Sequence, residues 1–120
     1  MGIAAKLQLK PGSTVAILAL PDDIELDLGD EIQVTTRPNG ADAVIAFAIN
    51  SAALDTKAAP AMDAARDDRL AWIAYPKAGK LDTDLNRDLL ARLAQQRGAQ
   101  PVRQIALDDT WSALRFRPAT

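Results

Sequence analysis

Three apolar segments of strand length constrain the fold of this 120-residue chain more than any other feature. They span residues 14–20, 43–49 and 70–75, and apolar and polar side chains do not alternate in any of them. A half-exposed strand shows that alternation, whereas a strand covered on both faces is apolar throughout. The pattern therefore predicts a largely parallel sheet with helices on both sides, in a single domain over residues 1–120.

Two helical stretches are expected beside these strands. Ser51 can cap a helix that runs to about residue 68, in which Pro60 either introduces a kink or begins a second helix. The clearest helix spans residues 84–97, because leucines recur there at every fourth position on one face. Asp82 or Thr83 can cap the start of this helix.

The C-terminal segment predicts an antiparallel hairpin. Its strands span residues 102–107 and 111–117, and the three residues between them form a tight connection. Paired carboxylates such as Asp108 and Asp109 can do acid–base chemistry, but adjacent residues in a tight turn more often bond to backbone amides. We therefore expect Asp109 and Thr110 to set the hairpin geometry and Trp111 to pack on the sheet.

Residues 21–42 allow two interpretations. Asp22–Leu28 is compatible with a short helix, and Glu31–Arg37 contains the β-branched residues of a strand. The Pro38–Gly40 turn leaves only about five residues before the next strand, which favours a hairpin between 31–37 and 43–49. The alternation of strands and helices along the chain favours a parallel arrangement, and the sequence leaves the choice open.

Missing residue types remove several classes of chemistry. The chain has no histidine and no cysteine, so it lacks an imidazole base, a thiolate nucleophile and the usual ligands of zinc. A formal charge of −2 gives no general attraction to nucleic acid or to an anionic membrane surface. Because no apolar run is long enough for a membrane helix and no secretory signal is recognisable, we expect a cytoplasmic protein.

The order of the predicted elements has a counterpart in a known family. A Lys-Pro-Gly turn leads into the first strand within residues 7–20, and apolar strands follow at 42–45 and 69–75. The 84–97 helix and the 102–117 hairpin come next. This layout resembles the class I S-adenosylmethionine-dependent methyltransferases. The resemblance implies a three-layer, Rossmann-like α/β domain of about six strands, mostly parallel, with a C-terminal antiparallel hairpin.

A second resemblance is more specific and covers residues 70–117. Tyr75-Pro76-Lys77 follows the third apolar segment, and residues 108–116 read Asp-Asp-Thr-Trp-Ser-Ala-Leu-Arg-Phe. Both motifs are similar to those of a group of small bacterial proteins whose function is uncharacterised. This resemblance implies a bacterial protein but no known activity.

The chain departs from the methyltransferases where their cofactor would bind. That family has a Gly-rich turn after the first strand, since the cofactor lies against bare backbone there. Here residues 20–24 read Leu-Pro-Asp-Asp-Ile, and a proline ring and two carboxylates would occupy the cofactor's space. Thr36-Arg37 replaces the acidic residue that would hold the ribose. We therefore expect no bound S-adenosylmethionine and no other cofactor.

Ligands of open α/β sheets bind beyond the carboxyl ends of the strands. The loops expected there supply seven candidate ligand-binding residues: Asp22, Asp23, Asn50, Ser51, Tyr75, Lys77 and Lys80. Tyr75, Lys77 and Lys80 could receive a small anion such as phosphate or carboxylate. Alternatively, Tyr75 ends a core strand and both lysines are solvated.

Six acidic residues fall between positions 22 and 31: Asp22, Asp23, Glu25, Asp27, Asp30 and Glu31. Their oxygens could hold Mg²⁺ or Ca²⁺, but the spacing of a calcium-binding loop is missing. We expect these side chains to cap a helix and to form a solvated face, and we predict no metal site.

Together these features predict a non-catalytic binding or interaction module derived from a methyltransferase-like fold. The expected partner is a small anionic ligand or another protein, without nucleic acid or membrane, and the chain could form a homodimer. The alternative is an enzyme, either a reduced S-adenosylmethionine-dependent methyltransferase or one that acts on a small anionic substrate through Tyr75, Lys77 and an aspartate.

Overall fold

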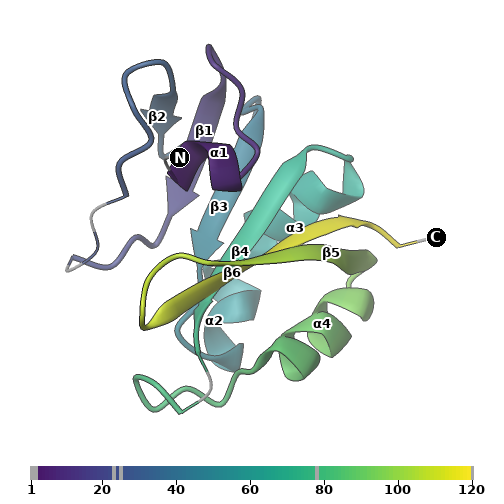
Figure 1. Ribbon diagram of the computed structural model, residues 1–120. Helices are drawn as coiled ribbons and strands as arrows, with labels where there is room; N and C mark the ends of the chain where they lie inside the picture. The colour runs from purple at the N-terminus through teal and green to yellow at the C-terminus, as the bar shows by residue number, and fades with distance from the viewer. Residues whose placement is uncertain (1–2, 23, 25, 78, 120) are drawn as a thin grey trace.

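A mixed α/β architecture is observed in a computed structural model that describes residues 3–22, 24, 26–77 and 79–119. Within these residues six strands form one sheet with the order β2-β1-β3-β4-β6-β5 (Figure 1). The strands are β1 (Thr14–Leu18), β2 (Gln33–Thr35), β3 (Ala43–Phe47), β4 (Leu70–Pro76), β5 (Ala99–Ala106) and β6 (Trp111–Pro118).

Most neighbouring strands of the sheet are parallel. β1 pairs with β2 on one side and with β3 on the other, and β3 pairs with β4, all in the same direction. β6 runs antiparallel between β4 and β5. The prediction of a mostly parallel α/β sheet with an antiparallel C-terminal pair is therefore confirmed.

The helices of the described residues are α1 (Ile3–Lys6), α2 (Ser51–Thr56), α3 (Ala59–Arg66) and α4 (Arg87–Gln95). Pro60 lies in the first turn of α3, so it begins a second helix instead of kinking one long helix. This position suits proline because the first turn of a helix needs no donor from its backbone nitrogen. The helix α1 was not predicted from the sequence.

The start of α4 differs from the prediction. The helix begins at Arg87 and is capped by Asn86, whose Oδ1 accepts a hydrogen bond of 2.8 Å from the backbone nitrogen of Leu89. Thr83, predicted as a cap, instead accepts a hydrogen bond from the backbone nitrogen of Leu85 in the preceding loop. Asn86 satisfies a donor of the first helical turn, so the helix starts later than the leucine pattern suggests.

The two faces of the sheet are covered differently. In β3, Val44 packs on the face that also carries α2, α3 and α4. Its neighbour Ile45 points to the opposite face, where it packs with Trp72 and with apolar residues outside the sheet: Leu7, Leu9 and Leu28. Figure 1 shows α1 in front of the sheet and α2 and α3 behind it. Strand residues are thus buried on both faces, as their unbroken apolar pattern predicted.

The helix predicted over Asp22–Leu28 is wrong. None of the described residues in this range is helical, and Asp23 and Glu25 lie outside the described residues. Ile24 and Leu26 are partly buried against the second face, and Leu28 is buried there. Apolar and acidic residues therefore alternate with period two, which extended chain satisfies and a helix does not.

The position of β2 decides between the two interpretations of residues 31–37. β2 pairs in parallel with β1, and β1 separates it from β3, so no hairpin joins these segments. Residues 36–42 connect β2 to β3. This short connection is sufficient because β2 contains only three residues, so the chain has little strand length to travel back along. Arg69 holds this return, since its Nη1 donates to the carbonyl oxygens of Pro38 and Ala41 at 2.9 and 3.0 Å.

The predicted C-terminal hairpin is confirmed, with longer strands than expected. Its turn is organised by Asp108, whose Oδ1 accepts hydrogen bonds from the backbone nitrogens of Thr110 and Trp111 at 2.8 and 2.7 Å. Asp108 therefore has the role predicted for Asp109. Trp111 is buried and packs edge-on against Phe47, with ring centroids 5.3 Å apart.

Candidate binding site

The carboxyl ends of β1, β3 and β4 lie at one edge of the sheet because these strands are parallel. After β1 the chain forms β2 on one side of β1, and it then returns to form β3 on the other side. Strand order therefore reverses between β1 and β3. Open α/β sheets bind their ligands in the crevice outside such a reversal.

Two of the predicted ligand-binding residues at this edge are engaged within the protein. Asn50 caps α2, since its Oδ1 accepts a hydrogen bond of 3.0 Å from the backbone nitrogen of Ala53. Ser51 donates to Asp84 twice, from its backbone nitrogen at 2.8 Å and from its hydroxyl group. These hydrogen bonds lower the pKa of the Asp84 carboxyl group.

Tyr75 belongs to the core rather than to the open edge. Its side chain is buried on the face covered by the helices, and its hydroxyl oxygen accepts a hydrogen bond of 3.2 Å from Nε2 of Gln104. Burial raises the pKa of the Tyr75 hydroxyl, the positive charge of Arg87 opposes this rise and the negative charge of Asp88 adds to it. Of the two roles considered for Tyr75, anion binding and the end of a core strand, its buried position in β4 fits the second.

Among the described residues, the remaining candidates Asp22, Lys77 and Lys80 form no ion pair with one another. Lys77 is half-buried and Lys80 is exposed, and the backbone nitrogen of Lys80 donates to the carbonyl oxygen of Lys77 at 2.9 Å. Asp22 is exposed in the loop after β1, and Asp23 lies outside the described residues. The structure thus joins Ser51 to Asp84, a residue that was not predicted, and leaves the lysines in a turn.

A pocket of about 440 Å³ opens at the reversal point. We call it the carboxyl-edge pocket, and it is lined by Ala19, Pro21, Phe47, Ile49, Ala53, Lys57, Leu81 and Trp111. Its volume falls within the range of small-molecule sites, roughly 300–1,000 Å³. Pro21, expected to occupy the space of a cofactor, lines this pocket and leaves it open.

The rim of the carboxyl-edge pocket is apolar and accessible. Ile49 and Leu81 are 47% and 51% exposed, and Leu20, between the lining residues Ala19 and Pro21 in the chain, is 39% exposed. Large apolar side chains that gather at one exposed place mark binding surfaces, whereas scattered ones do not. The charge at this pocket comes from Lys57, which forms no ion pair within the described part of the chain.

Two residues of the pocket have strained backbone. Ala19 has a φ of 58° and Leu81 a φ of 53°, in the left-handed region that side chains disfavour. Such residues persist only where the surrounding structure imposes them, and they cluster at ligand sites. Both strained residues, Ala19 and Leu81, line the same pocket.

The described lining of the carboxyl-edge pocket combines apolar side chains with one ammonium group. Among the described residues that line it, none carries a carboxylate, hydroxyl or imidazole group. Over residues 3–22, 24, 26–77 and 79–119, no cluster of three or more acidic side chains could hold a metal ion. The pocket can therefore enclose an apolar group and pair an anionic one with Lys57.

Comparison with known proteins adds no family. A scan against models of protein families finds no match for the chain, and a search of curated proteins finds none either. None of the helices in the described residues is long and apolar enough to cross a membrane.

Sequence reasoning missed Ala19, Lys57 and Leu81 as pocket residues. Leu81 could have been found, because it is the one large apolar residue in the loop over residues 77–84. Nothing in the sequence separates Lys57 from other surface lysines, since its place depends on how α2 packs beside the loop after β1. The backbone conformation of Ala19 likewise has no sequence signal.

Proposed function

We propose that this chain is a non-catalytic binding module whose ligand is a small amphipathic anion held in the carboxyl-edge pocket. The observation that carries the proposal is an accessible apolar pocket at the reversal of strand order, with a lysine as the charged residue of its lining. The apolar part of the ligand would contact Phe47, Ile49 and Leu81. Its anionic group would pair with Lys57.

The contacts of the predicted polar residues support binding over catalysis. Asn50, Ser51 and Tyr75 all use their side chains in hydrogen bonds within the protein. A group that holds a helix cap or lies in the core is not free to move protons on a substrate. A methyltransferase reaction would also need space for a nucleotide-like cofactor against bare backbone, and Pro21 lines that position.

The proposal includes descent from a three-layer, Rossmann-like domain. The parallel order β2-β1-β3-β4 and the position of the pocket support it, because dinucleotide-binding folds place their ligands at the same reversal of strand order. In this chain α1 and the segment around Leu7 and Leu9 cover the second face.

Titration by nuclear magnetic resonance tests this function with three probes of graded chemistry. Hexanoate carries both an apolar body and a carboxylate, hexanol lacks the charge and acetate lacks the apolar body. We expect hexanoate to shift the amide resonances of Ala19, Ile49 and Leu81, hexanol to shift them more weakly and acetate to leave them unchanged. Equal shifts with acetate and hexanoate, or shifts only elsewhere, would contradict the proposal.

A pair of lysine variants tests the role of charge. Lys57→Gln should weaken hexanoate binding by about three- to fivefold, the size expected of an exposed ion pair, and should leave hexanol binding unchanged. Lys80→Gln is the matched control, since Lys80 is exposed near this edge but does not line the pocket. If both variants weaken hexanoate equally, the ligand's charge is not recognised by Lys57.

A further inference from the structure

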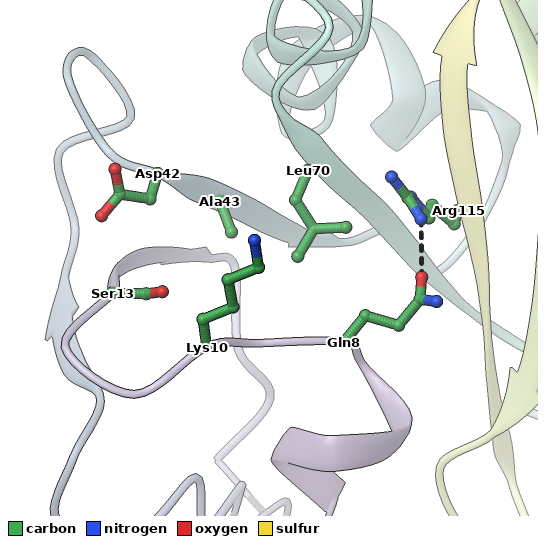
Figure 2. Close-up of a pocket in the computed structure, with 7 residues that line it drawn as sticks. All are labelled: Gln8, Lys10, Ser13, Asp42, Ala43, Leu70 and Arg115. Atoms are coloured by element: carbon green, nitrogen blue, oxygen red, sulfur yellow. Dashed lines mark hydrogen bonds between the residues drawn. The ribbon is translucent and has the colours of Figure 1, made fainter.

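A second pocket lies at the amino ends of the strands, opposite the carboxyl-edge pocket (Figure 2). Its volume is about 430 Å³, and we call it the amino-edge pocket. Figure 2 shows Arg115 and Gln8 at one end, Asp42 and Ser13 at the other, and the side chain of Lys10 extending between them. These polar groups come from the segment before β1, the start of β3 and the middle of β6.

Arg115 differs from the other half-buried arginines of the protein. Arg69 and Arg97 each pair with an aspartate. Arg115 has no carboxylate partner in the described residues. A guanidinium group that leaves water without a counter-charge is unfavourable unless something else compensates it.

The hydrogen bonds of Arg115 orient it without neutralising it. One Nη1–H donates to the side-chain oxygen of Gln8 at 2.6 Å, whereas Nε is buried and has no acceptor in the described residues. Gln8 itself has a φ of 63°, and its backbone nitrogen donates to the carbonyl oxygen of Ala5 at the end of α1. The neutral side-chain amide of Gln8 thus orients the guanidinium group of Arg115 but does not neutralise its charge.

Neighbouring groups make this end of the pocket more positive. Arg103 of β5 lies directly opposite Arg115 across the β5–β6 ladder, and like charges in that position repel. Lys10 adds an ammonium group from the loop before β1. An oxyanion placed between Lys10 and Arg115 would relieve this repulsion, and guanidinium groups bind phosphate and carboxylate with two parallel hydrogen bonds.

The opposite end of the pocket offers acceptors. Asp42 accepts a hydrogen bond of 2.9 Å from the backbone nitrogen of Thr14 through Oδ2, and its Oδ1 has no partner in the described part of the chain. Ser13, half-buried beside it, adds a hydroxyl group. A ligand that fits both ends therefore carries an oxyanion at one end and hydroxyl donors at the other.

We infer that the amino-edge pocket binds a small hydroxylated organic anion, with its phosphate or carboxylate between Lys10 and Arg115 and its hydroxyl groups on Asp42 and Ser13. This site is separate from the carboxyl-edge pocket, and neither depends on the other. The ligand's oxyanion is bound here by a half-buried guanidinium group, whereas Lys57 of the first pocket is exposed.

Calorimetric titration of the wild-type protein with four probes tests the inference. Glycerol 3-phosphate and glycerate carry an oxyanion together with hydroxyl groups, inorganic phosphate carries only the oxyanion and glycerol only the hydroxyl groups. We expect one or both hydroxylated anions to bind at least threefold more tightly than inorganic phosphate, and glycerol not to bind. The stronger of the two anions identifies the oxyanion as phosphate or carboxylate. Binding of glycerol as tight as that of both anions, or no binding of either anion, would overturn the inference.

Three variants and a control locate the site. Arg115→Gln should weaken anion binding by about tenfold or more, and Lys10→Gln by about threefold, because both remove charge from the oxyanion end. Arg92→Gln, on an exposed position of α4 outside the pocket, should change nothing. Asp42→Asn should leave inorganic phosphate binding intact and reduce the preference for the hydroxylated anion. Equal effects of Arg92→Gln and Lys10→Gln would assign the binding to general surface charge and overturn the inference.

A spectroscopic readout keeps the test valid if Arg115→Gln does not fold. The Nε–H of Arg115 is buried and has no acceptor among the residues that the structure describes, and burial slows its exchange with water, so its resonance should be observable in the wild-type protein. Addition of the bound anion should shift this resonance while the amide resonances of Ile49 and Leu81 in the other pocket stay in place. A titration that moves Ile49 and Leu81 but not the Arg115 resonance would place the anion in the carboxyl-edge pocket and overturn the inference.

Discussion

The indole nitrogen of Trp72 donates a hydrogen bond of 3.0 Å to the backbone carbonyl oxygen of Leu7. Both residues are fully buried, and 65 positions of sequence separate them. The bond ties the N-terminal segment to the centre of the sheet. Gln8, which orients Arg115, follows immediately after Leu7, so the same bond supports one end of the amino-edge pocket.

Trp72→Phe leaves the buried carbonyl oxygen of Leu7 without its donor. This unpaired acceptor should by itself lower the free energy of unfolding by about 1–3 kcal/mol, apart from the loss of packing contacts. Urea denaturation measures the loss, and faster amide exchange of residues 7–9 should accompany it. Trp111→Phe is the matched control, since Trp111 is equally buried but makes no indole hydrogen bond in the described residues. Equal losses in the two variants would show that the hydrogen bond contributes nothing.

Ser51→Ala should raise the pKa of Asp84 toward its ordinary value of 3.8, because the serine hydroxyl is the largest cause of the lowered pKa. A carboxyl group with a lowered pKa stabilises the fold above its ordinary pKa, and this contribution disappears as the pH falls through the lower, folded value. Carboxyl carbon resonances followed from pH 5 to pH 2 measure the change. Ser112→Ala is the control, and an unchanged Asp84 titration in Ser51→Ala would contradict the assignment.

The wild-type protein should lose stability at alkaline pH as Tyr75 ionises, and Tyr75→Phe should not show this loss. The folded pKa of Tyr75 is raised above 10.0, so its contribution is fully present below the ordinary pKa and disappears as the pH rises through the folded value. Tyr75 is the single tyrosine of the chain, so phenolate absorbance reports its titration directly. At neutral pH the variant should lose about 0.5–1.5 kcal/mol with the Gln104 hydrogen bond. Identical alkaline unfolding of wild type and variant would refute the prediction.

Gly98→Ala should destabilise the protein by more than Gly40→Ala. Both glycines have positive φ, 86° and 80°, and an alanine in that region costs about 1–2 kcal/mol. At Gly98 an added Cβ would also lie 3.2 Å from Cδ of Arg66, whereas nothing lies within 4 Å at Gly40. The difference between the melting temperatures of the two variants measures the cost of the contact with Arg66, because both variants share the backbone cost. Equal melting temperatures would show that the Arg66 side chain moves away without cost.

Buried strands were the most predictable part of the fold, because unbroken apolar runs such as residues 43–49 are too short for membrane helices and match strands that are covered on both faces. The segment after β1 was misread because Ile24, Leu26 and Leu28 were grouped as a short helix, although their spacing of two residues matches an extended chain. The parallel pairing of β2 could not be derived, since a connection normally too short for a crossover becomes sufficient when the strand has three residues.

The candidate sites were less predictable than the fold. A ligand was expected at the carboxyl edge, and a pocket opens there, but apart from Lys57 its described lining is apolar instead of consisting of the predicted polar residues. The amino-edge pocket was not expected at all. It depends on Arg115, whose sequence neighbours mark it only as an outward residue of a terminal strand, and on Gln8, whose backbone conformation leaves no trace in the sequence.

The sheet order has a consequence for synthesis of the chain. β6 lies between β4 and β5, although it follows both of them in the sequence. A nascent chain that has emerged through Ala106 therefore holds β5 with no neighbour to pair with and β4 with one open edge. A chain truncated in the turn around Asp108 should therefore aggregate, whereas the chain that includes β6 should stay in solution, because β6 pairs with both β4 and β5.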